Sequence, residues 1–109
     1  MRYILNSAVI TAPGAYTYAL VSDDEACAWL DAGPYVSTIG YAETAQAFTA
    51  LLGRTVEHDV GRRQIRMERD DEALVLRLTS RLPDPAAKGA VGVEWIQSHA
   101  EMGVLRRTG

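Results

Sequence analysis

Residues 22–34 carry a short helix that is marked at both ends, and this bounded helix constrains the fold more than any other feature. Ser22 and Glu25 stand at the spacing of a capping box, in which each side chain accepts a hydrogen bond from the other residue's amide. Gly33 and Pro34 end the helix. The side chains that share its apolar face are Ala26, Trp29 and Leu30.

Strand-like segments stand on both sides of this helix. Residues 3–11 and 16–21 are rich in aromatic and β-branched residues, and a Pro-Gly turn at 13–14 separates them. Residues 35–39 form a further short extended segment. Strands interrupted by a helix with one apolar face predict a mixed sheet with helices packed on it.

The second half of the chain continues this alternation. A second helix follows Gly40 and Tyr41 and ends at Gly53, with an apolar face made by Ala47, Phe48, Leu51 and Leu52. Residues 64–67 and 73–78 read as the strands of a hairpin around the turn at 69–71. The remaining expected elements are a loop at 83–90, a short helix at 92–100 and a strand at 103–107.

The chain of 109 residues is expected to form one compact domain over residues 1–109, of the mixed α/β class. Its 48% hydrophobic and 23% charged residues are typical of a globular protein. No apolar run approaches the roughly 18 residues of a membrane span, and Asn6 and Ser7 interrupt the N-terminal apolar run before it resembles a signal peptide. These features favour a cytoplasmic protein.

The basic residues are almost all arginine. Lys88 is the single lysine beside ten arginines, and arginine binds phosphate groups in a bidentate way. The net charge of −3 argues against bulk binding of DNA or RNA. A basic patch must therefore be built by geometry, from the arginines that crowd one stretch: Arg62, Arg63, Arg66, Arg69, Arg77 and Arg81.

Metal and cofactor motifs are missing from the sequence. His58 and His99 lie far apart, without cysteine or paired carboxylates at ligand spacing. There is no phosphate loop, dinucleotide fingerprint or serine-nucleophile elbow. Cys27 is alone in an apolar helical stretch and reads as a small hydrophobic residue. We therefore expect no metal and no cofactor.

Four segments, in this order, resemble the signatures of a ring-nuclease family that includes viral type III anti-CRISPR proteins. They are YILNSAVIT, STIGYAETAQAFTALLG, RRQIRMERDDEALVLRLTSRL and MGVLRR, and they span nearly the whole chain. The resemblance implies a compact homodimer that binds cyclic tetra-adenylate, the second messenger of type III CRISPR complexes. In such enzymes a ribose 2′-hydroxyl attacks its neighbouring phosphate, without a metal, and gives a 2′,3′-cyclic phosphate.

The resemblance places a catalytic histidine directly after an Ile-Gly pair, and this sequence has Tyr41 there. A phenol, with a pKa near ~10, is a poorer proton donor and acceptor at neutral pH than imidazole. Gly40 at the helix start still suits an anion. Tyr41 is thus a candidate catalytic residue or a packing side chain, and slow cleavage and binding without cleavage both stay open.

The other candidate residues come from the same comparison. Arg81 matches a phosphate-contacting, catalytic arginine; otherwise it is a solvated charge at a strand end. Asp84 is a candidate acidic partner, although the sequence after Arg81 departs from the family pattern. Arg62 matches an arginine of the loop before the hairpin, with Arg63 adjacent; one of the two is a ligand contact and the other a surface charge, and which is which stays open. Hydroxyl candidates for the pocket are Thr11 and Ser7. Thr44 is either a hydroxyl of the first turn of the second helix or a further ligand contact.

The expected function is to bind a cyclic oligoadenylate and so damp type III CRISPR signalling, in the host cytoplasm if the protein is viral. It would act as a slow ring nuclease or as a non-cleaving sponge. The alternative is a protein-binding module, such as an inhibitor of a defence complex, that kept the fold without nucleotide chemistry. The retained Arg81 and Arg62 favour the first, and the lost histidine favours the second.

Overall fold

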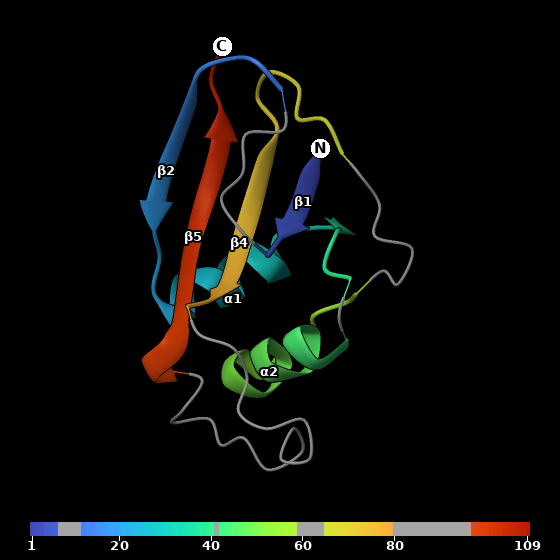
Figure 1. The fold of residues 1–109 in the computed structure, drawn as a ribbon, viewed down its shortest axis with the longest axis vertical. Coiled ribbons are helices and arrows are strands. Elements are labelled where there is room, and N and C mark those ends of the chain that lie inside the picture. The colour runs from blue at the N-terminus through green and yellow to red at the C-terminus, as the bar shows by residue number, and fades with distance from the viewer. Residues whose placement is uncertain (7–11, 41, 59–64, 80–96) are drawn as a thin grey trace.

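The computed structural model describes residues 1–6, 12–40, 42–58, 65–79 and 97–109. Within these segments, five strands form one sheet in the order β2-β5-β4-β1-β3, and two helices pack against it (Figure 1). In chain order the elements are β1 (Arg2–Leu5), β2 (Tyr16–Leu20), α1 (Asp23–Asp31), β3 (Val36–Ser37), α2 (Ala42–Leu52), β4 (Glu72–Leu78) and β5 (Ala100–Arg107).

The sheet is mixed, as the sequence predicts. β1 is parallel to both of its neighbours, β3 and β4, whereas β5 is antiparallel to β4 and to β2. The carboxyl ends of β1, β3 and β4 therefore point toward the same end of the sheet, and α2 lies at that end (Figure 1). The expected fold class, a mixed sheet with helices packed on it, is confirmed.

One face of the sheet is covered by the two helices. Phe48 of α2 is completely buried there, and the apolar face of α1 packs into the same layer. The sheet contributes side chains from three strands, among them Ile4, Leu74 and Met102. The predicted apolar faces of both helices are therefore the ones that the fold buries.

The opposite face of the sheet holds a second, smaller core. It consists of Leu5, Met67, Ala73, Val75 and Leu105. Because successive side chains of a strand point to opposite faces, β4 supplies alternate residues to the two cores. Residues 73–76 are consequently all buried, although β4 is an ordinary alternating strand.

The helix ends follow local chemistry. The Glu25 amide donates to Ser22 Oγ at 3.2 Å, and the Ser22 amide donates to Glu25 Oε1 at 3.1 Å, so the capping box is confirmed. Gly53 follows α2 with a φ of +65°, a left-handed conformation that glycine adopts without steric cost.

The end of α1 is tied to β1. The Arg2 guanidinium lies 3.8 Å from the centre of the Trp29 ring and donates to the Gly33 carbonyl at 2.7 Å. It also donates to the Trp29 carbonyl, which accepts a second hydrogen bond from the Ala32 amide at 3.3 Å in the last helical turn. Cation–π contact and carbonyl capping thus fix where the helix stops relative to the sheet.

The expected hairpin between residues 64–67 and 73–78 is wrong for the part that the structure describes. Residues 65–68 form no strand, because both edges of β4 are occupied, by β1 and by β5. The turn itself is present: Asp71 accepts from the Glu68 amide at 2.8 Å, and Asp70 has a φ of +70°. Just before this turn, Met67 is buried against the sheet in the second core.

Several boundaries also differ from the sequence-based expectation. The first strand ends at Leu5, and residues 7–11, 64 and 80–96 lie outside the described part, as does the loop expected at 83–90. The last strand is longer than 103–107 because it starts at Ala100, where it pairs with Leu78. Of the helix expected at 92–100, only residues 97–99 are described as helical. None of the described helices has the length and apolarity to cross a membrane.

Candidate functional site

The structure brings three strand ends and one helix start together at the same end of the sheet. β1, β3 and β4 end there, and α2 begins two residues after Gly40. In open sheets of this kind, ligands bind beyond the carboxyl ends of parallel strands. The amides of a helix start also favour an anion. We refer to this region as the strand-end site.

The segment that carries Gly40 is held in place by hydroxyl groups. Thr38 donates from its amide and from Oγ1 to the Ile4 carbonyl, each at 2.9 Å, which fastens it to the end of β1. Ser37 Oγ donates to the Glu57 carbonyl at 2.7 Å and accepts from the Ile39 amide at 3.2 Å. These hydroxyls serve the fold, and they hold the backbone that leads to Gly40 in one position.

Two of the predicted site residues lie among the described residues. Gly40 is half-buried between β3 and α2, and Thr44 is half-buried in the first turn of α2. The other predicted site residues lie outside the described residues: Tyr41, Arg81, Thr11, Ser7, Arg62, Arg63 and Asp84. Their positions in the sequence still place Tyr41 directly before α2, and Arg81 three residues after β4.

The histidines and the cysteine do not approach one another as a cluster. His58 is exposed, and the His99 carbonyl accepts from the Thr79 amide at 2.7 Å and from Thr79 Oγ1 at 3.0 Å. Cys27 is half-buried, and its thiol donates to the Leu52 carbonyl at 3.2 Å. Among the described residues, no group of three or more His, Cys, Asp or Glu side chains could hold a metal ion.

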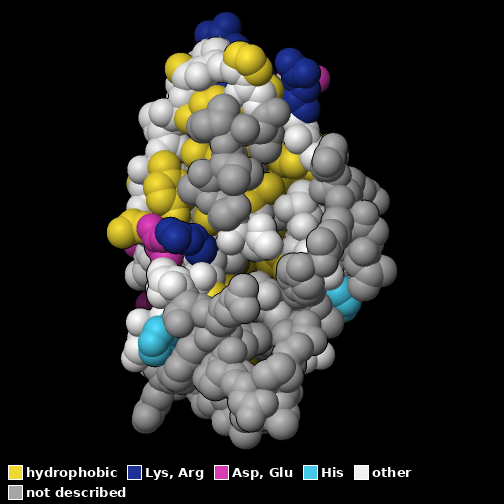
Figure 2. All heavy atoms as spheres, viewed as in Figure 1, with side chains coloured by type: hydrophobic (Ala, Val, Ile, Leu, Met, Phe, Trp, Pro, Cys, Tyr) yellow, Lys and Arg dark blue, Asp and Glu magenta, His cyan; other side chains and the backbone are white. Residues whose placement is uncertain are grey.

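The described arginines of the crowded stretch are spread over the molecule. Arg77 pairs with Glu101 at 2.9 Å on a sheet face, whereas Arg69 lies in the turn before β4. Basic side chains are visible at the end of the molecule where β4 begins and β5 ends, away from α2 (Figure 2). The described arginines thus form no single basic patch at the strand-end site.

A pocket of about 260 Å³ is the feature that the sequence reasoning missed. It lies beside the last turn of α2, whereas the strand-end site lies at the first turn; the 11 residues of α2 separate the two by about 16 Å. Its lining comes from β2, α1, α2, β5 and the turn at 97–99: Leu20, Val21, Asp23, Leu51, Gln97, Ala100, Glu101 and Met102.

The fold and the strand-end site define a small mixed α/β protein. Residues 2–96 match the model of the STIV B116-like family, and the chain belongs to this family. It is 37% identical, over 82 residues, to the uncharacterized protein YddF of Bacillus subtilis strain 168. That match covers 73% of this chain and 74% of YddF.

The fold is that of a solved viral protein. B116 of Sulfolobus turreted icosahedral virus superposes with a TM-score of 0.79, over 97% of this chain and 98% of B116. The two sequences are 18% identical, so this likeness establishes the fold alone.

Proposed function

We propose that the protein binds a cyclic oligoadenylate, preferentially cyclic tetra-adenylate, and thereby lowers type III CRISPR signalling. The observation that carries this proposal is the strand-end site, where three parallel strands end beside the start of α2. A ring of phosphodiesters is an anion with several acceptor oxygens. Backbone amides at a helix start suit such a ligand, and Gly40 leaves room for its close approach.

The flanking sequence supplies the charges that the proposal needs. Arg81 follows β4, and Arg62 and Arg63 precede it, so these arginines are the proposed phosphate ligands. Thr44 and Thr11 are proposed hydroxyl contacts, and Asp84 is the proposed acidic partner of Arg81. None of these roles requires a cofactor.

The proposed cleavage is an internal transfer within the ring. The ribose 2′-oxygen forms a bond to the adjacent phosphorus, and the bond from phosphorus to the 5′-oxygen breaks. The 2′-hydroxyl loses one proton and the leaving 5′-oxygen takes one, so the products are a 2′,3′-cyclic phosphate and a 5′-hydroxyl. Tyr41 would handle a proton poorly near neutral pH, which favours slow turnover or a sponge that only sequesters the ring.

The proposed functional unit is a homodimer, and the surface that supports it is the edge of β2 with which no described strand pairs. In an antiparallel pair, hydrogen-bonded and non-hydrogen-bonded residues alternate. The Val21 amide donates to Met102 of β5, so Tyr16, Tyr18 and Leu20 direct their amides and carbonyls to the open side. β2 contains no charged residue and no proline, the devices that usually protect an edge strand.

In a two-fold symmetric dimer, the outer edge of β2 would pair with the same edge of β2 in the second copy. Centred on Tyr18, this pairing sets Tyr16 opposite Leu20 of the second copy, and all outward amides find carbonyls. We expect light scattering at micromolar concentration to give a dimer and Leu20→Lys to shift it toward monomer. A stable wild-type monomer would remove the two-fold site.

Calorimetry against cyclic tri-, tetra- and hexa-adenylate tests the function directly, followed by chromatography of each mixture for linear products. Saturable binding of the tetra-adenylate with little product supports the sponge, and steady product formation supports the slow nuclease. Absence of heat with all three rings, from a folded dimer, would favour the protein-binding alternative instead.

A further inference from the structure

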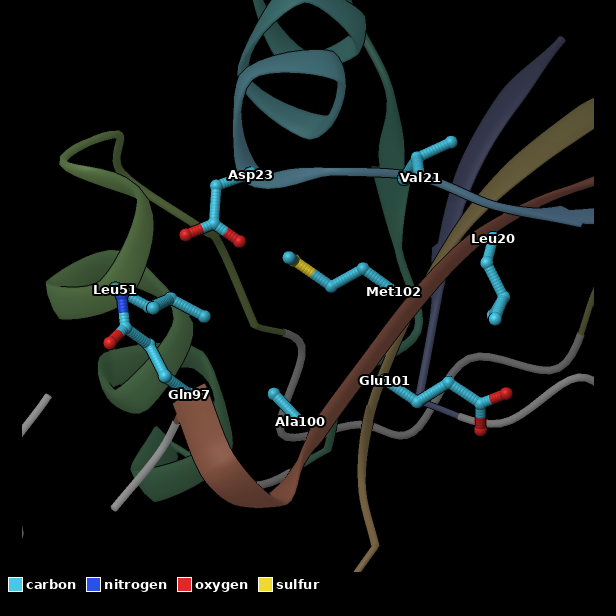
Figure 3. Close-up of a pocket in the computed structure, with 8 residues that line it drawn as sticks. All are labelled: Leu20, Val21, Asp23, Leu51, Gln97, Ala100, Glu101 and Met102. Atoms are coloured by element: carbon cyan, nitrogen blue, oxygen red, sulfur yellow. The ribbon is translucent and has the colours of Figure 1, made fainter. Parts of the chain in front are cut away.

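The pocket beside the last turn of α2 combines an apolar floor with an acidic side chain that points into it. Met102, which is 8% exposed, forms the floor together with half-buried Val21 and Leu51. The Asp23 carboxylate is directed toward Met102 and Leu51 (Figure 3). An anion therefore faces hydrocarbon and sulfur across the pocket.

No described residue neutralises this carboxylate. The ion pairs between described residues join other partners, and no described arginine or lysine lines the pocket. Glu101, the other acid of the lining, is turned away from the centre (Figure 3) and is already paired with Arg77 at 2.9 Å. The Asp23 carboxylate is thus the negative charge in the pocket that no described cation pairs with, and it favours a positively charged ligand.

Capping accounts for the other acids of this helical turn but not for the direction of Asp23. Glu25 completes the capping box, and Asp24 is exposed to water. An acid at this position also complements the helix dipole, but that role does not require the carboxylate to point over an apolar floor. The mouth of the pocket is apolar too, since Leu20 at its rim is 67% exposed.

We propose that this pocket binds a small organic cation, a guanidinium or primary ammonium group carried on a short alkyl stem. The stem would lie against Leu51, Val21 and Met102, and the charged group would pair with Asp23. The volume of about 260 Å³ is below the roughly 300 Å³ of the smallest drug-sized pockets. One such group fits within it, supplied by a free alkyl cation or by one basic side chain of a peptide.

The test uses the whole chain and follows methyl resonances by NMR during titration with n-butylguanidinium chloride. We expect saturable shifts at the methyl groups of Leu20, Val21, Leu51 and Met102. Guanidinium chloride without the stem and n-butanol without the charge should give much smaller shifts at equal concentration. Titration with N-acetyl-arginine amide separates the sources: binding of similar strength assigns the pocket to basic side chains, and weaker binding assigns it to free cations.

A matched pair of variants isolates the carboxylate. Asp23→Asn should weaken n-butylguanidinium binding by about tenfold, the loss of one partly buried charge pair. Asp24→Asn removes the same charge from the next residue of the same helical turn and should leave the affinity unchanged. Equal effects of both variants, or shifts that grow linearly and spread over the whole protein, would overturn the proposal.

Discussion

The ring of Tyr18 lies across Gly103 of the neighbouring strand. A Cβ atom added to Gly103 would stand 2.5–2.6 Å from Cε1, Cζ and Oη of the tyrosine, closer than real side chains allow. Tyr18 is directly opposite Leu105, so this is a diagonal contact across β2 and β5. Because Gly103 has no side chain, the Tyr18 ring of the edge strand β2 can pack directly against the backbone of β5.

Gly103→Ala is expected to destabilise the protein by roughly 0.5–1 kcal/mol, because the added methyl group forces the exposed Tyr18 ring out of its position. Urea unfolding of the variant measures the loss. In a Tyr18→Ser background the same substitution should cost much less, and this coupling is the decisive comparison. An equal cost in both backgrounds would show that the tyrosine ring does not depend on Gly103.

The elements that the sequence predicted correctly have local determinants. Both ends of α1 and the end of α2 follow from residues within one helical turn, such as Ser22, Glu25 and Gly53. The strand expected at 64–67 depended instead on which strands occupy the edges of β4. Those partners of β4 are β1, about seventy residues earlier in the chain, and β5, about twenty-five residues later. No local sequence pattern determines which strands pair with β4.

Ser22→Ala should lower the free energy of unfolding by about 0.5–2 kcal/mol, because the Glu25 amide loses its acceptor. Thermal unfolding followed by circular dichroism provides the measurement. Asp24→Ala, which leaves both hydrogen bonds of the capping box intact, is the control and should have the smaller effect. If the two variants unfold at the same temperature, the capping box contributes no more than the helix dipole.

Glu72 makes the free energy of unfolding depend on pH in the acidic range. The hydrogen bond that Arg106 donates at 2.6 Å holds the pKa of the Glu72 carboxyl below its ordinary value, against the opposing effect of partial burial. The unfolded chain then takes up the proton first, so this stabilisation is present above the unfolded pKa and is lost as pH falls through the folded one.

Arg106→Gln should therefore reduce the difference in urea midpoint between pH 7 and pH 3. Most of the change is expected at pH 7, where the wild-type pair is ionised, and little at pH 3. Arg69→Gln removes an exposed positive charge from the turn before β4 and serves as the control. A pH difference that stays as large in Arg106→Gln as in the wild type would exclude this pair as its source.

The strand-end site was partly readable from the sequence, and the pocket was not. Gly40 and Thr44 stand where a strand signal changes to a helix signal, so their place at a helix start follows locally. The pocket is lined from three separate stretches of the chain, at 20–23, 51 and 97–102, and its Leu51 and Met102 look like ordinary core residues in the sequence. Only the direction of Asp23 distinguishes it (Figure 3), and a side-chain direction is set by the packed structure.

If cyclic tetra-adenylate binds as proposed, Arg81→Ala should weaken binding by about 1.5–3 kcal/mol, the range for a hydrogen bond to a charged group. The affinity should also fall less steeply with added salt in the variant, since one phosphate contact is missing. Arg69→Ala, in the turn before β4 and away from the carboxyl ends of the strands, is the control. An unchanged dissociation constant in a folded Arg81→Ala protein would identify this arginine as a surface charge.

Tyr41→His is expected to raise the rate of ring cleavage well above that of the wild type. Tyr41 directly precedes α2 and follows Gly40 in the sequence. Because hydroxyl contacts hold the backbone that leads to Gly40, an imidazole at position 41 would be added next to a helix start that is already formed. General acid–base catalysis contributes typically about 10²–10⁴-fold, and the substitution should recover part of that range. Chromatographic assay of linear products under single-turnover conditions measures it.

The pH profile distinguishes proton transfer from a change in packing. An imidazole titrates near pH ~6.5, so the gain in Tyr41→His should show a limb near neutrality that the wild type lacks. Tyr41→Phe keeps the ring and removes the hydroxyl, and it should leave binding intact while abolishing any residual cleavage that depends on the phenol. If the wild type cleaves rapidly and Tyr41→Phe cleaves equally fast, Tyr41 is a packing residue and the proton donor lies elsewhere.

Because the sequence after Arg81 also departs from the family pattern, the rate gained by Tyr41→His should fall short of that of a full catalytic site. Placing an acidic residue directly after Arg81, as the resembling family often has it, by Leu82→Glu in the Tyr41→His background, should then increase the rate further.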